Sequence, residues 1–352
     1  MCGMDSLTQA VLGAGIGGAV LGRFHGRKAL LAGALLATLP DLDVLIGQND
    51  PISTMIHHRG FSHSVLFLSV FAPALAWLWH RWRPQRDYGF RRLLLALWLI
   101  LVTHPLLDAF TSYGTQLFWP LRPTPTSWSS IFIIDPFYTV PLAAAVAAFL
   151  LFGHGPRVRK GLLVALGWSV VYLGLSLSAK TLVEQRVIRA VAQDGITAVR
   201  VFSTPQPFSI VLWRVVVQTD DDHYVEAVTG LLDGDAPERQ RLPLNSHLAR
   251  ILPAEHPLTG LRWFTDDWLR YDVIQGKLVV SDLRMGIGTG YYSFRFLLAE
   301  QDARDRSWRI LVPEYWRRSR DLSQLSATMR RILHPTPPLP LARWEEQMHV
   351  SP

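Results

Sequence analysis

A histidine and an aspartate lie four residues apart inside a strongly apolar stretch of this sequence. His104 and Asp108 fall within Leu93–Phe110, a run long enough to enter a bilayer. Their spacing puts both side chains on one face of a helix, and such polar groups are costly to bury in lipid. A functional site is therefore one interpretation, and a hydrogen-bonded pair that joins two helices is the other. Pro105, which directly follows His104, predicts a kink or a helix start here.

Four further candidate ligands precede this pair in the chain. Asp41 and Asp43 follow an apolar run that ends at Pro40, and His58 and His63 precede the next run. Imidazole nitrogens mixed with carboxylate oxygens suit Zn²⁺ or a similar divalent ion, and carboxylates can bridge two ions. The two aspartates share a side only if their segment is extended, as Pro40 predicts. We expect a divalent-metal site, with zinc as the expected ion, built from Asp41, Asp43, His58, His63, His104 and Asp108.

The chemistry that such a site would support is hydrolysis. A bound divalent ion lowers the pKa of a water molecule and creates a nucleophile at neutral pH. Asp41 or Asp43 would then take the proton of this water. Arg59, next to His58, suits a phosphoryl oxygen because a guanidinium binds phosphate through two parallel hydrogen bonds. The alternative for Arg59 is an interfacial side chain that meets lipid head groups, which is also the favoured interpretation of His57.

Six apolar runs in the first half of the chain predict an α-helical membrane bundle that positions these residues. They are Leu7–Val20, Ala29–Pro40, Val65–Trp79, Leu93–Phe110, Phe137–Phe152 and Gly161–Ala179. Several are shorter than the roughly 20 residues of a straight span. The second run is the shortest and predicts a half-span or a re-entrant segment. The first run is rich in glycine, which allows helices to pack closely.

The composition fits an integral membrane protein. The 352 residues are 49% hydrophobic with a mean hydropathy of +0.18, and the apolar residues concentrate before residue 180. The single cysteine, Cys2, excludes an internal disulfide and a cysteine-based metal cluster. No basic segment precedes the first apolar run, so a cleavable signal peptide is not expected. The net charge of +7 lies largely in short loops, where it indicates topology rather than nucleic-acid binding.

The positive charges predict the orientation of the bundle. Eleven lie in the loops after the first, third and fifth runs, namely Arg23, Arg27, Lys28, Arg81, Arg83, Arg86, Arg91, Arg92, Arg157, Arg159 and Lys160, against Arg59 and Arg122 in the opposite loops. The side with more positive charges is normally cytoplasmic. We therefore expect the loops 41–64 and 111–136, and everything after residue 179, to lie outside the cytoplasm. All six candidate ligands are then on the outer face, as are Asp5, Gln9 and Asp135.

From residue 180 the sequence changes to that of a mixed α+β domain. An amphipathic helix over 181–194 continues from the sixth run and should end at Gly195. The expected strands are 209–218, 223–232, 271–274, 277–283, 291–298 and 308–312, followed by a helix over 319–333 and an extended proline-rich tail. We therefore expect two domains, residues 1–179 in the membrane with the metal site and residues 180–352 outside the cytoplasm.

Four ordered blocks of sequence carry a resemblance to a bacterial family. They are Asp5–Gln9, Pro40–Asp43, His58–Ser64 and Thr103–Asp108. These blocks resemble the signatures of the membrane-bound, metal-dependent hydrolases, also described as LexA-regulated inner-membrane hydrolases. The resemblance covers about half of the chain and implies a multi-pass hydrolase of the bacterial inner membrane.

A more distant similarity is to zinc-dependent phospholipase C and the P1-type nucleases. These enzymes place an aspartate, a histidine and a His-x-x-x-Asp pair around several zinc ions. The residues that match this order are Asp41 or Asp43, His58 or His63, and His104 with Asp108. A second downstream His-x-x-x-Asp/Glu motif is not evident, so a three-zinc cluster is in doubt. The similarity implies a phosphoester bond in a lipid or lipid-linked substrate.

Two other classes of function stay open on the residues alone. Intramembrane histidine and aspartate also build proton and ion pathways in transporters, although here they gather at one face and no inverted repeat is apparent. A membrane scaffold with a structural polar cluster is the third class. The expected partners are membrane lipids and a lipid or lipid-linked substrate, and nucleic acid is not expected.

Overall fold

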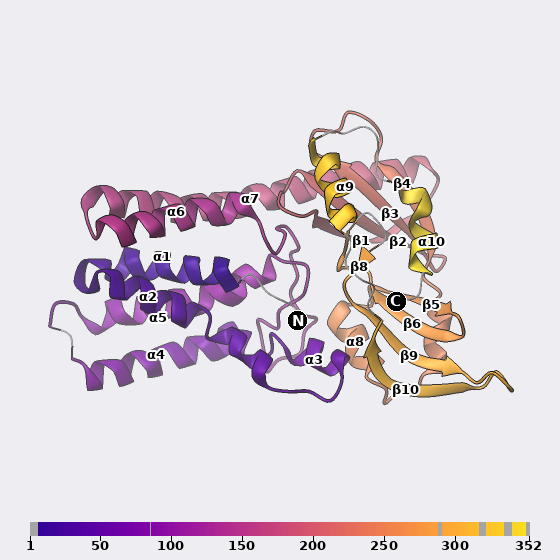
Figure 1. Ribbon diagram of the computed structural model, residues 1–352, viewed down its shortest axis with the longest axis horizontal. Coiled ribbons are helices and arrows are strands. Elements are labelled where there is room, and N and C mark those ends of the chain that lie inside the picture. The colour runs from indigo at the N-terminus through magenta and orange to yellow at the C-terminus, as the bar shows by residue number, and fades with distance from the viewer. Residues whose placement is uncertain (1–5, 85, 288–290, 317–321, 334–339, 350–352) are drawn as a thin grey trace. The chain divides into compact units, whose positions relative to one another are not determined.

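Contacts within the chain define two compact units (Figure 1). The structure is a computed structural model that describes residues 6–84, 86–287, 291–316, 322–333 and 340–349. Unit 1 comprises Met1–Ile46, His58–Trp128 and Ile133–Leu175, and unit 2 comprises Gly47–His57, Ser129–Phe132 and Ser176–Pro352. Each unit is described on its own below.

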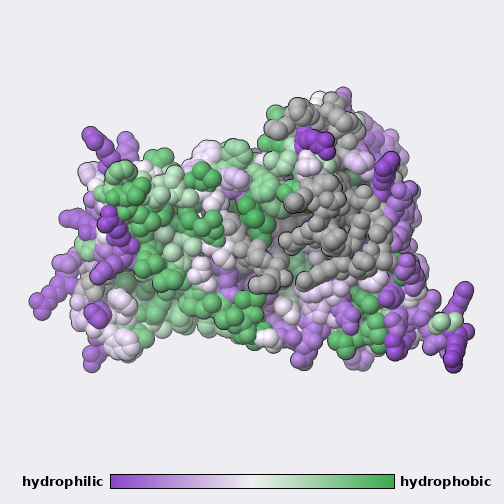
Figure 2. Space-filling model, viewed as in Figure 1, coloured by the Kyte–Doolittle hydropathy of each residue, from purple (hydrophilic) through white to green (hydrophobic). Residues whose placement is uncertain are grey.

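All six apolar runs form helices. These are α1 (Ser6–His25), α2 (Arg27–Ala37), α4 (Val65–Trp82), α5 (Phe90–Ala109), α6 (Pro136–Phe152) and α7 (Pro156–Gln193). In unit 1, α1 packs against α2, α5 and α6, and α4 packs against α5. Four helices, α1, α4, α5 and α7, are long and apolar enough to cross a membrane, and α6 is a shorter apolar helix. Hydrophobic side chains cover the sides of these helices. Hydrophilic residues gather at the end where loops join α1 to α2, α4 to α5 and α6 to α7 (Figures 1 and 2). The predicted α-helical bundle is confirmed.

Helix α2 is too short to cross a bilayer alone. Its 11 residues extend about 16 Å, roughly half of a 30 Å hydrocarbon core. Glycines hold it against α1, because a Cβ atom at Gly13 would lie 2.4 Å from the carbonyl oxygen of Gly33. A Cβ atom at Gly17 would lie 2.4 Å from the carbonyl oxygen of Ala29. The backbones of α1 and α2 therefore touch directly, as the glycine content predicts.

Helix α5 corrects one expectation. It continues without a break from Phe90 to Ala109, so of the two alternatives predicted at Pro105, a kink or a helix start, the helix start is excluded. Buried neighbours on both sides of the proline, among them Leu101 and Leu107, hold the helix in place. This packing offsets the backbone hydrogen bond that the proline removes.

The connection from α2 to α4 contains two short 3₁₀ turns with a further segment between them. They are η1 (Pro40–Leu45) and η2 (Phe61–His63). The extended conformation predicted around Asp41 and Asp43 is wrong, because Pro40 begins η1 with a backbone angle that also suits a helix start. A 3₁₀ helix has three residues per turn, so side chains two positions apart diverge by about 120°. Asp41 and Asp43 therefore point toward different partners.

Unit 2 contains two four-stranded antiparallel sheets. The first has the order β1 (Ala198–Pro205), β2 (Leu212–Thr219), β3 (His223–Gly230), β4 (Glu238–Pro243). The second has the order β10 (Trp308–Tyr315), β9 (Arg295–Gln301), β6 (Lys277–Asp282), β5 (Leu269–Ile274), and β7 (Gly286–Ile287) pairs with β8 (Tyr291–Tyr292). The helical elements are α3 (Pro51–His57), α8 (Leu258–Thr265), α9 (Leu322–Leu333), α10 (Trp344–Met348), η3 (Ser246–Ile251) and η4 (Leu341–Arg343).

The mixed α+β character predicted after residue 180 is confirmed. Every expected strand overlaps an observed one, although the expected strand 291–298 is divided between β8 and β9, and β1, the polar β4 and the short β7 were not predicted. Helix α7 ends before Gly195, which has a positive φ of 74°, and packs Val183 and Val187 against the first sheet. The predicted helix over 319–333 corresponds to α9, and residues 319–321 lie outside the described residues. Most of the proline-rich tail, 334–339, also lies outside them.

Candidate metal centre

Three elements of unit 1 bring four polar side chains to one point. Asp41 comes from η1, His63 from η2, and His104 and Asp108 from α5. One nitrogen or oxygen atom from each of the four lies within 4.8 Å of the others. Both imidazoles are fully buried, and Asp41 is the most exposed of the four side chains at 15%. Four of the six predicted ligands therefore converge, from segments far apart in the sequence.

The distances within this group match those of a tetrahedral metal site. The Nε2 atoms of His63 and His104 are 3.1 Å apart. Each lies 3.3–3.5 Å from Asp41 Oδ1 and from Asp108 Oδ2. In a tetrahedral zinc site with bonds of about 2.0–2.1 Å, neighbouring ligand atoms are about 3.3–3.4 Å apart. The residues present therefore fit a divalent ion such as zinc.

The opposite ring nitrogens identify the atoms that carry protons. His104 Nδ1 donates to the carbonyl oxygen of Ala37 at 2.6 Å. Ser62 Oγ gives its proton to Asp43 Oδ2 at 2.7 Å, so the contact of 3.0 Å between Ser62 Oγ and His63 Nδ1 has the imidazole as donor. A neutral imidazole with a proton on Nδ1 has a lone pair on Nε2. In their neutral forms, with the proton on Nδ1, both histidines present lone pairs to the shared point, as metal-binding histidines do.

The carboxylate oxygens at this point lack hydrogen-bond donors. Both oxygens of Asp41 and Oδ2 of Asp108 are buried without a hydrogen-bond partner among the described residues. Buried polar atoms nearly always have such a partner, so an unsatisfied group needs an explanation. A single cation would satisfy the two lone pairs and these oxygens together, whereas one proton can bridge only two of the atoms.

The electrostatics of the two turns favour a positive charge here. Burial lowers the pKa of the His63 imidazole, but contacts with Asp108, Asp41 and Asp43 outweigh burial and raise this pKa to about 10. Burial also opposes the charge of Asp41, yet His104 and His63 hold the pKa of its carboxyl below the ordinary value. The group therefore stabilises ionised carboxylates around one positive charge, which is what a metal ion requires.

Asp43 and His58 are not among the four converging residues. Asp43 lies on the Nδ1 side of the His63 ring, away from the shared point, and His58 binds to Asp43. Asp43 Oδ1 accepts from His58 Nδ1 at 2.8 Å, and Oδ2 accepts from the backbone nitrogen of Arg59 at 3.0 Å and from Ser62 Oγ. Burial opposes the charge of Asp43, but His58 and His63 hold the pKa of its carboxyl below the ordinary value. Both oxygens of Asp43 are thus engaged, and their contacts orient the ring of His63.

Arg59 lies inside unit 1 and is 1% exposed. Its NH2 group is 3.3 Å from Asp108 Oδ1, and NH1 donates to Thr111 Oγ1 at 3.1 Å. The guanidinium also stacks over the ring of Tyr113 at 4.9 Å. An exposed role among lipid head groups is therefore excluded for this arginine. The guanidinium supports Asp108 from the side opposite the shared point, because it contacts Oδ1 while Oδ2 faces the histidines.

Comparison with known proteins identifies the family. Residues 4–183, just over half of the chain, match the family described as YdjM inner membrane protein. The chain belongs to the YdjM family. It is 32% identical to the uncharacterized protein YfhP of Bacillus subtilis (strain 168) over 238 residues, which cover 63% of this chain and 67% of YfhP. No solved structure matches the chain.

A second relative supports a membrane location. The inner membrane protein YbcI of Escherichia coli (strain K12) is 32% identical over 137 residues, which cover 38% of this chain and 70% of YbcI. YdjM is an inner membrane protein family, and the four apolar helices agree with that. The YdjM match includes all four converging residues.

One residue within the YdjM match has a role that the sequence did not predict. Gln9 on α1 is buried, and its Nε2 donates to Asp108 Oδ1 at 3.1 Å and to the carbonyl oxygen of His104 at 3.2 Å. The sequence signals were its position near the start of an apolar helix and its place in the block Asp5–Gln9. Asp135, in contrast, caps α6 and accepts from Tyr172, so it lies outside the centre. His57 is bonded to the carbonyl oxygen of Ser53 in α3, and Asp5 lies outside the described residues.

Proposed function

We propose that this protein is a membrane-bound, metal-dependent hydrolase that cleaves a phosphoester in a lipid or lipid-linked substrate. The observation that carries the proposal is the pair of facing Nε2 atoms, 3.1 Å apart, with both Nδ1 protons committed elsewhere. Two imidazoles and two carboxylates are a donor set that suits zinc. When bound, a zinc ion supplies Lewis-acid chemistry, lowering the pKa of water and polarising a phosphoryl oxygen.

The contacts of Asp41, Asp43 and Arg59 suggest a different role for each of them in such a reaction. Asp41 is the best candidate to accept the proton of the attacking water, because its oxygens have no hydrogen-bond donor and its side chain is the most exposed of the four. Asp43 is less suited to that role, since both of its oxygens are engaged. The contacts of Arg59 favour holding Asp108 over the direct phosphoryl contact expected from the sequence.

Apolar residues next to the ligands support a lipid substrate. Leu42, between the two aspartates of η1, is 54% exposed, and Leu45 is 77% exposed. Phe61, two residues before His63, is 42% exposed and contacts the rings of Phe67 and Trp119. Tryptophan, here Trp119, is enriched at membrane interfaces. The turns that carry the ligands thus suit the boundary between hydrocarbon and head groups, where a lipid phosphoester lies.

The experiment that tests the proposal uses the full chain, purified in detergent. We expect bound zinc by elemental analysis and cleavage of a phospholipid phosphoester in mixed micelles. His104→Ala should lose both. The matched control is His25→Ala, because His25 is bonded to Tyr88 in the same unit and contacts none of the four residues. Arg59→Ala removes the guanidinium that holds Asp108, so zinc should bind about 10–100-fold more weakly, and Arg59→Lys should recover part of that affinity.

The outcomes separate the parts of the proposal. A parent protein that binds no divalent ion overturns the metal centre. A zinc-loaded parent that cleaves no phosphoester, either in lipid or in bis(p-nitrophenyl) phosphate, overturns the phosphoester reaction while leaving the metal centre in place.

We also propose that unit 2 lies outside the cytoplasm. The support is the excess of positive charge in the loops α1–α2, α4–α5 and α6–α7, which favours a cytoplasmic location for that end of the helices. A reporter that is active only in the cytoplasm, fused after the C-terminus, should be inactive, whereas a fusion to the α4–α5 loop should be active. An active C-terminal fusion would overturn this orientation.

A further inference from the structure

Both loops at the ligand end of unit 1 contain a segment that belongs to unit 2. The first loop carries Asp41 and His63, and its middle part, Gly47–His57, is assigned to unit 2 by its contacts. The second loop follows Asp108, and Ser129–Phe132 within it is likewise assigned to unit 2. The residues on either side of each segment return to unit 1. The metal centre is therefore covalently flanked by parts of the other unit.

The first of these segments is firmly anchored within unit 2. It forms α3, which packs against α8 and β10. Asp50 caps this short helix by accepting hydrogen bonds from the backbone nitrogens of Ile52 and Ser53. Ile52 is 0% exposed and Met55 is 1% exposed. Ile56 leaves so little room that a Cβ atom at Gly260 of α8 would lie 2.7 Å from its Cδ1 atom.

The anchor is directly joined to the residues that position the ligands. His57, the last residue of α3, is followed by His58, which donates to Asp43. This hydrogen bond closes a loop between residues 15 apart, and the whole of α3 lies inside the loop. Closing a flexible loop of this length would require a loss of chain entropy that grows with its length. Because α3 is already folded onto unit 2, this part of the loop has lost its chain entropy, and the remaining cost of closing the loop is smaller.

We propose that α3 fixes the geometry of the metal centre, so that Ile52 and Met55 are positioning residues for the ligands although neither lies among them. The inference rests on metal binding at this site and not on hydrolysis. It explains why the chain inserts a helix of unit 2 between the turn that carries Asp41 and the turn that carries His63. It also gives unit 2 a route to the metal centre, because anything that displaces α3 alters the segment that begins at His58.

The test measures metal affinity in variants that leave every ligand intact. Ile52→Ala creates a cavity under α3, and it should weaken zinc binding by about fivefold or more, the range typical of coupling between sites. Ile52→Val should restore most of the affinity. Gly260→Val, which pushes on Ile56 from α8, should weaken binding in the same direction. Affinity is measured by competition with a zinc chelator on the full chain in detergent.

A matched control separates this role from general destabilisation. Leu278→Ala in β6 also empties a 0% exposed site of unit 2, but Leu278 belongs to a strand of the second sheet and not to α3. It should leave zinc affinity within about twofold of the parent. The absorption bands of Co²⁺ bound in place of zinc report ligand geometry, so they should shift in Ile52→Ala and not in Leu278→Ala.

Each outcome has one meaning. Zinc affinity and Co²⁺ bands equal to the parent in Ile52→Ala overturn the role of α3. An equal loss in Ile52→Ala and Leu278→Ala overturns it too, because the effect would then follow the stability of unit 2. A parent that binds no zinc overturns the metal centre itself, which is the separate failure described above.

Discussion

Both units bury charged side chains, but the two sets differ in the balance of donors and acceptors. In unit 2, Arg214 donates to both oxygens of Glu226 and also to the hydroxyl of Tyr292. Arg270 binds Asp272 in the same way, and Arg284 binds Asp282. Each carboxylate faces a guanidinium that fills its lone pairs. Such pairs are complete in themselves and need no ligand.

The cluster in unit 1 has the opposite composition. The Nε2 atoms of both histidines and two carboxylate oxygens, Asp41 Oδ1 and Asp108 Oδ2, converge there, and Arg59 pairs with the other oxygen of Asp108. Gln9 contributes a donor to that same oxygen. The difference teaches that burial of charge does not identify a binding site. An excess of buried acceptors over donors is the more informative signal, because an added cation would satisfy it.

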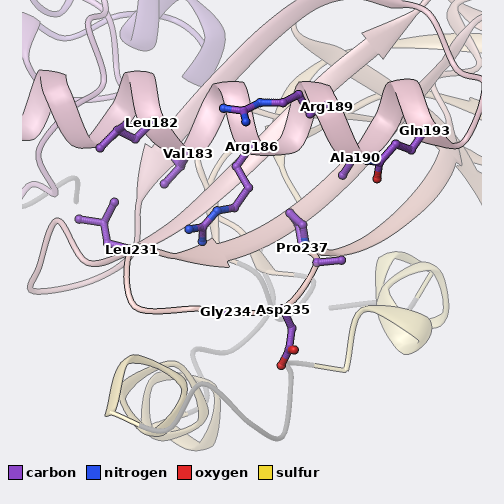
Figure 3. Close-up of a pocket in the computed structure, with 11 residues that line it drawn as sticks. Leu182, Val183, Arg186, Arg189, Ala190, Gln193, Leu231, Gly234, Asp235 and Pro237 are labelled. Carbon is purple, nitrogen blue, oxygen red and sulfur yellow. The ribbon is translucent and has the colours of Figure 1, made fainter.

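Two pockets of unit 2 contain charged side chains whose hydrogen-bonding groups already have partners. One is a groove of about 480 Å³ between the end of α7 and the loop after β3, with Arg186 and Leu182 on its helical wall (Figure 3). Arg186 already donates to Thr229 and to the carbonyl oxygen of Gly230. The other pocket, near the β2–β3 turn, is lined by residues such as Arg262 and Asp267 that are paired with each other. Neither groove has the unsatisfied acceptors of the metal centre.

The largest expected effect is the loss of metal from unit 1. Asp108→Ala should abolish zinc binding, because it removes one of four ligands and leaves the guanidinium of Arg59 near the site. Asp282→Ala, which removes an equally buried carboxylate of unit 2, should leave the zinc content of the folded protein unchanged. Elemental analysis of the purified variants measures both. Stoichiometric zinc in Asp108→Ala would contradict the distinction between the two clusters.

The next effect concerns the stability of unit 2. Arg214→Met leaves Glu226 buried without its partner and should destabilise the fold by about 3–5 kcal/mol. The double variant Arg214→Met, Glu226→Leu should recover most of that loss, because a buried ion pair can be replaced by apolar side chains. Denaturant unfolding followed by tryptophan fluorescence measures the difference. A double variant as unstable as the single one would show that the pair itself stabilises the fold.

A smaller effect is expected from the support of His63. Asp43→Asn keeps the shape of the side chain but weakens its hydrogen bonds with His58, Ser62 and His63, so zinc should bind about 10–100-fold more weakly. Chelator competition gives the affinity. The matched variant Asp135→Asn changes a buried aspartate that caps α6 and contacts none of the ligands, so it should leave the affinity unchanged. Parental affinity in Asp43→Asn would mean that the orientation of His63 does not depend on Asp43.

The smallest effect is a pH dependence of the free energy of unfolding, caused by an ion pair of unit 2. Asp233 accepts from Arg331 at 2.9 Å and from the backbone of Gly230 at 2.7 Å, and these bonds outweigh burial and lower the pKa of its carboxyl. The pair therefore contributes its full stability above the unfolded pKa of about 3.9 and loses it as the pH falls through the lower folded pKa. The contribution should be at most about 1 kcal/mol. Asp233→Asn should flatten the acid limb of the unfolding free energy between pH 5 and 2, and an unchanged limb would exclude this carboxylate.

The sequence predicted which side chains converge more accurately than the contacts that each of them makes. Residue type and helical spacing were sufficient for His104 and Asp108, because a histidine and an aspartate stand out in an apolar helix. The division between Asp41 and Asp43 depended on whether their segment is extended or a 3₁₀ turn. That choice is made by the contacts of η1 with η2 and α5, which no local pattern reports.

Most helices and strands of the fold were also predictable from the sequence. Apolar runs located all six helices of the bundle, and stretches rich in apolar and β-branched residues located β2, β3, β5, β6, β9 and β10. Strand β4, with the sequence Glu-Arg-Gln-Arg-Leu-Pro, carries almost no apolar residues because it is an edge strand. Helix α3 was missed because its two buried residues, Ile52 and Met55, give too short a pattern to indicate a helix.

The direct contact between α1 and α2 has a consequence for how the chain enters the membrane. Helix α2 has too few apolar residues to partition into a bilayer by itself, and its last carbonyl, at Ala37, is satisfied by His104 of α5. During synthesis α5 emerges much later than α2, so until then that carbonyl has no partner from α5. We therefore expect α1 and α2 to insert as one hairpin, held by the contact between Gly13 and Gly33, and to reach their final depth only after α5 has arrived. In this order of events His104 completes the insertion of a helix, a role separate from the proposed binding of a metal.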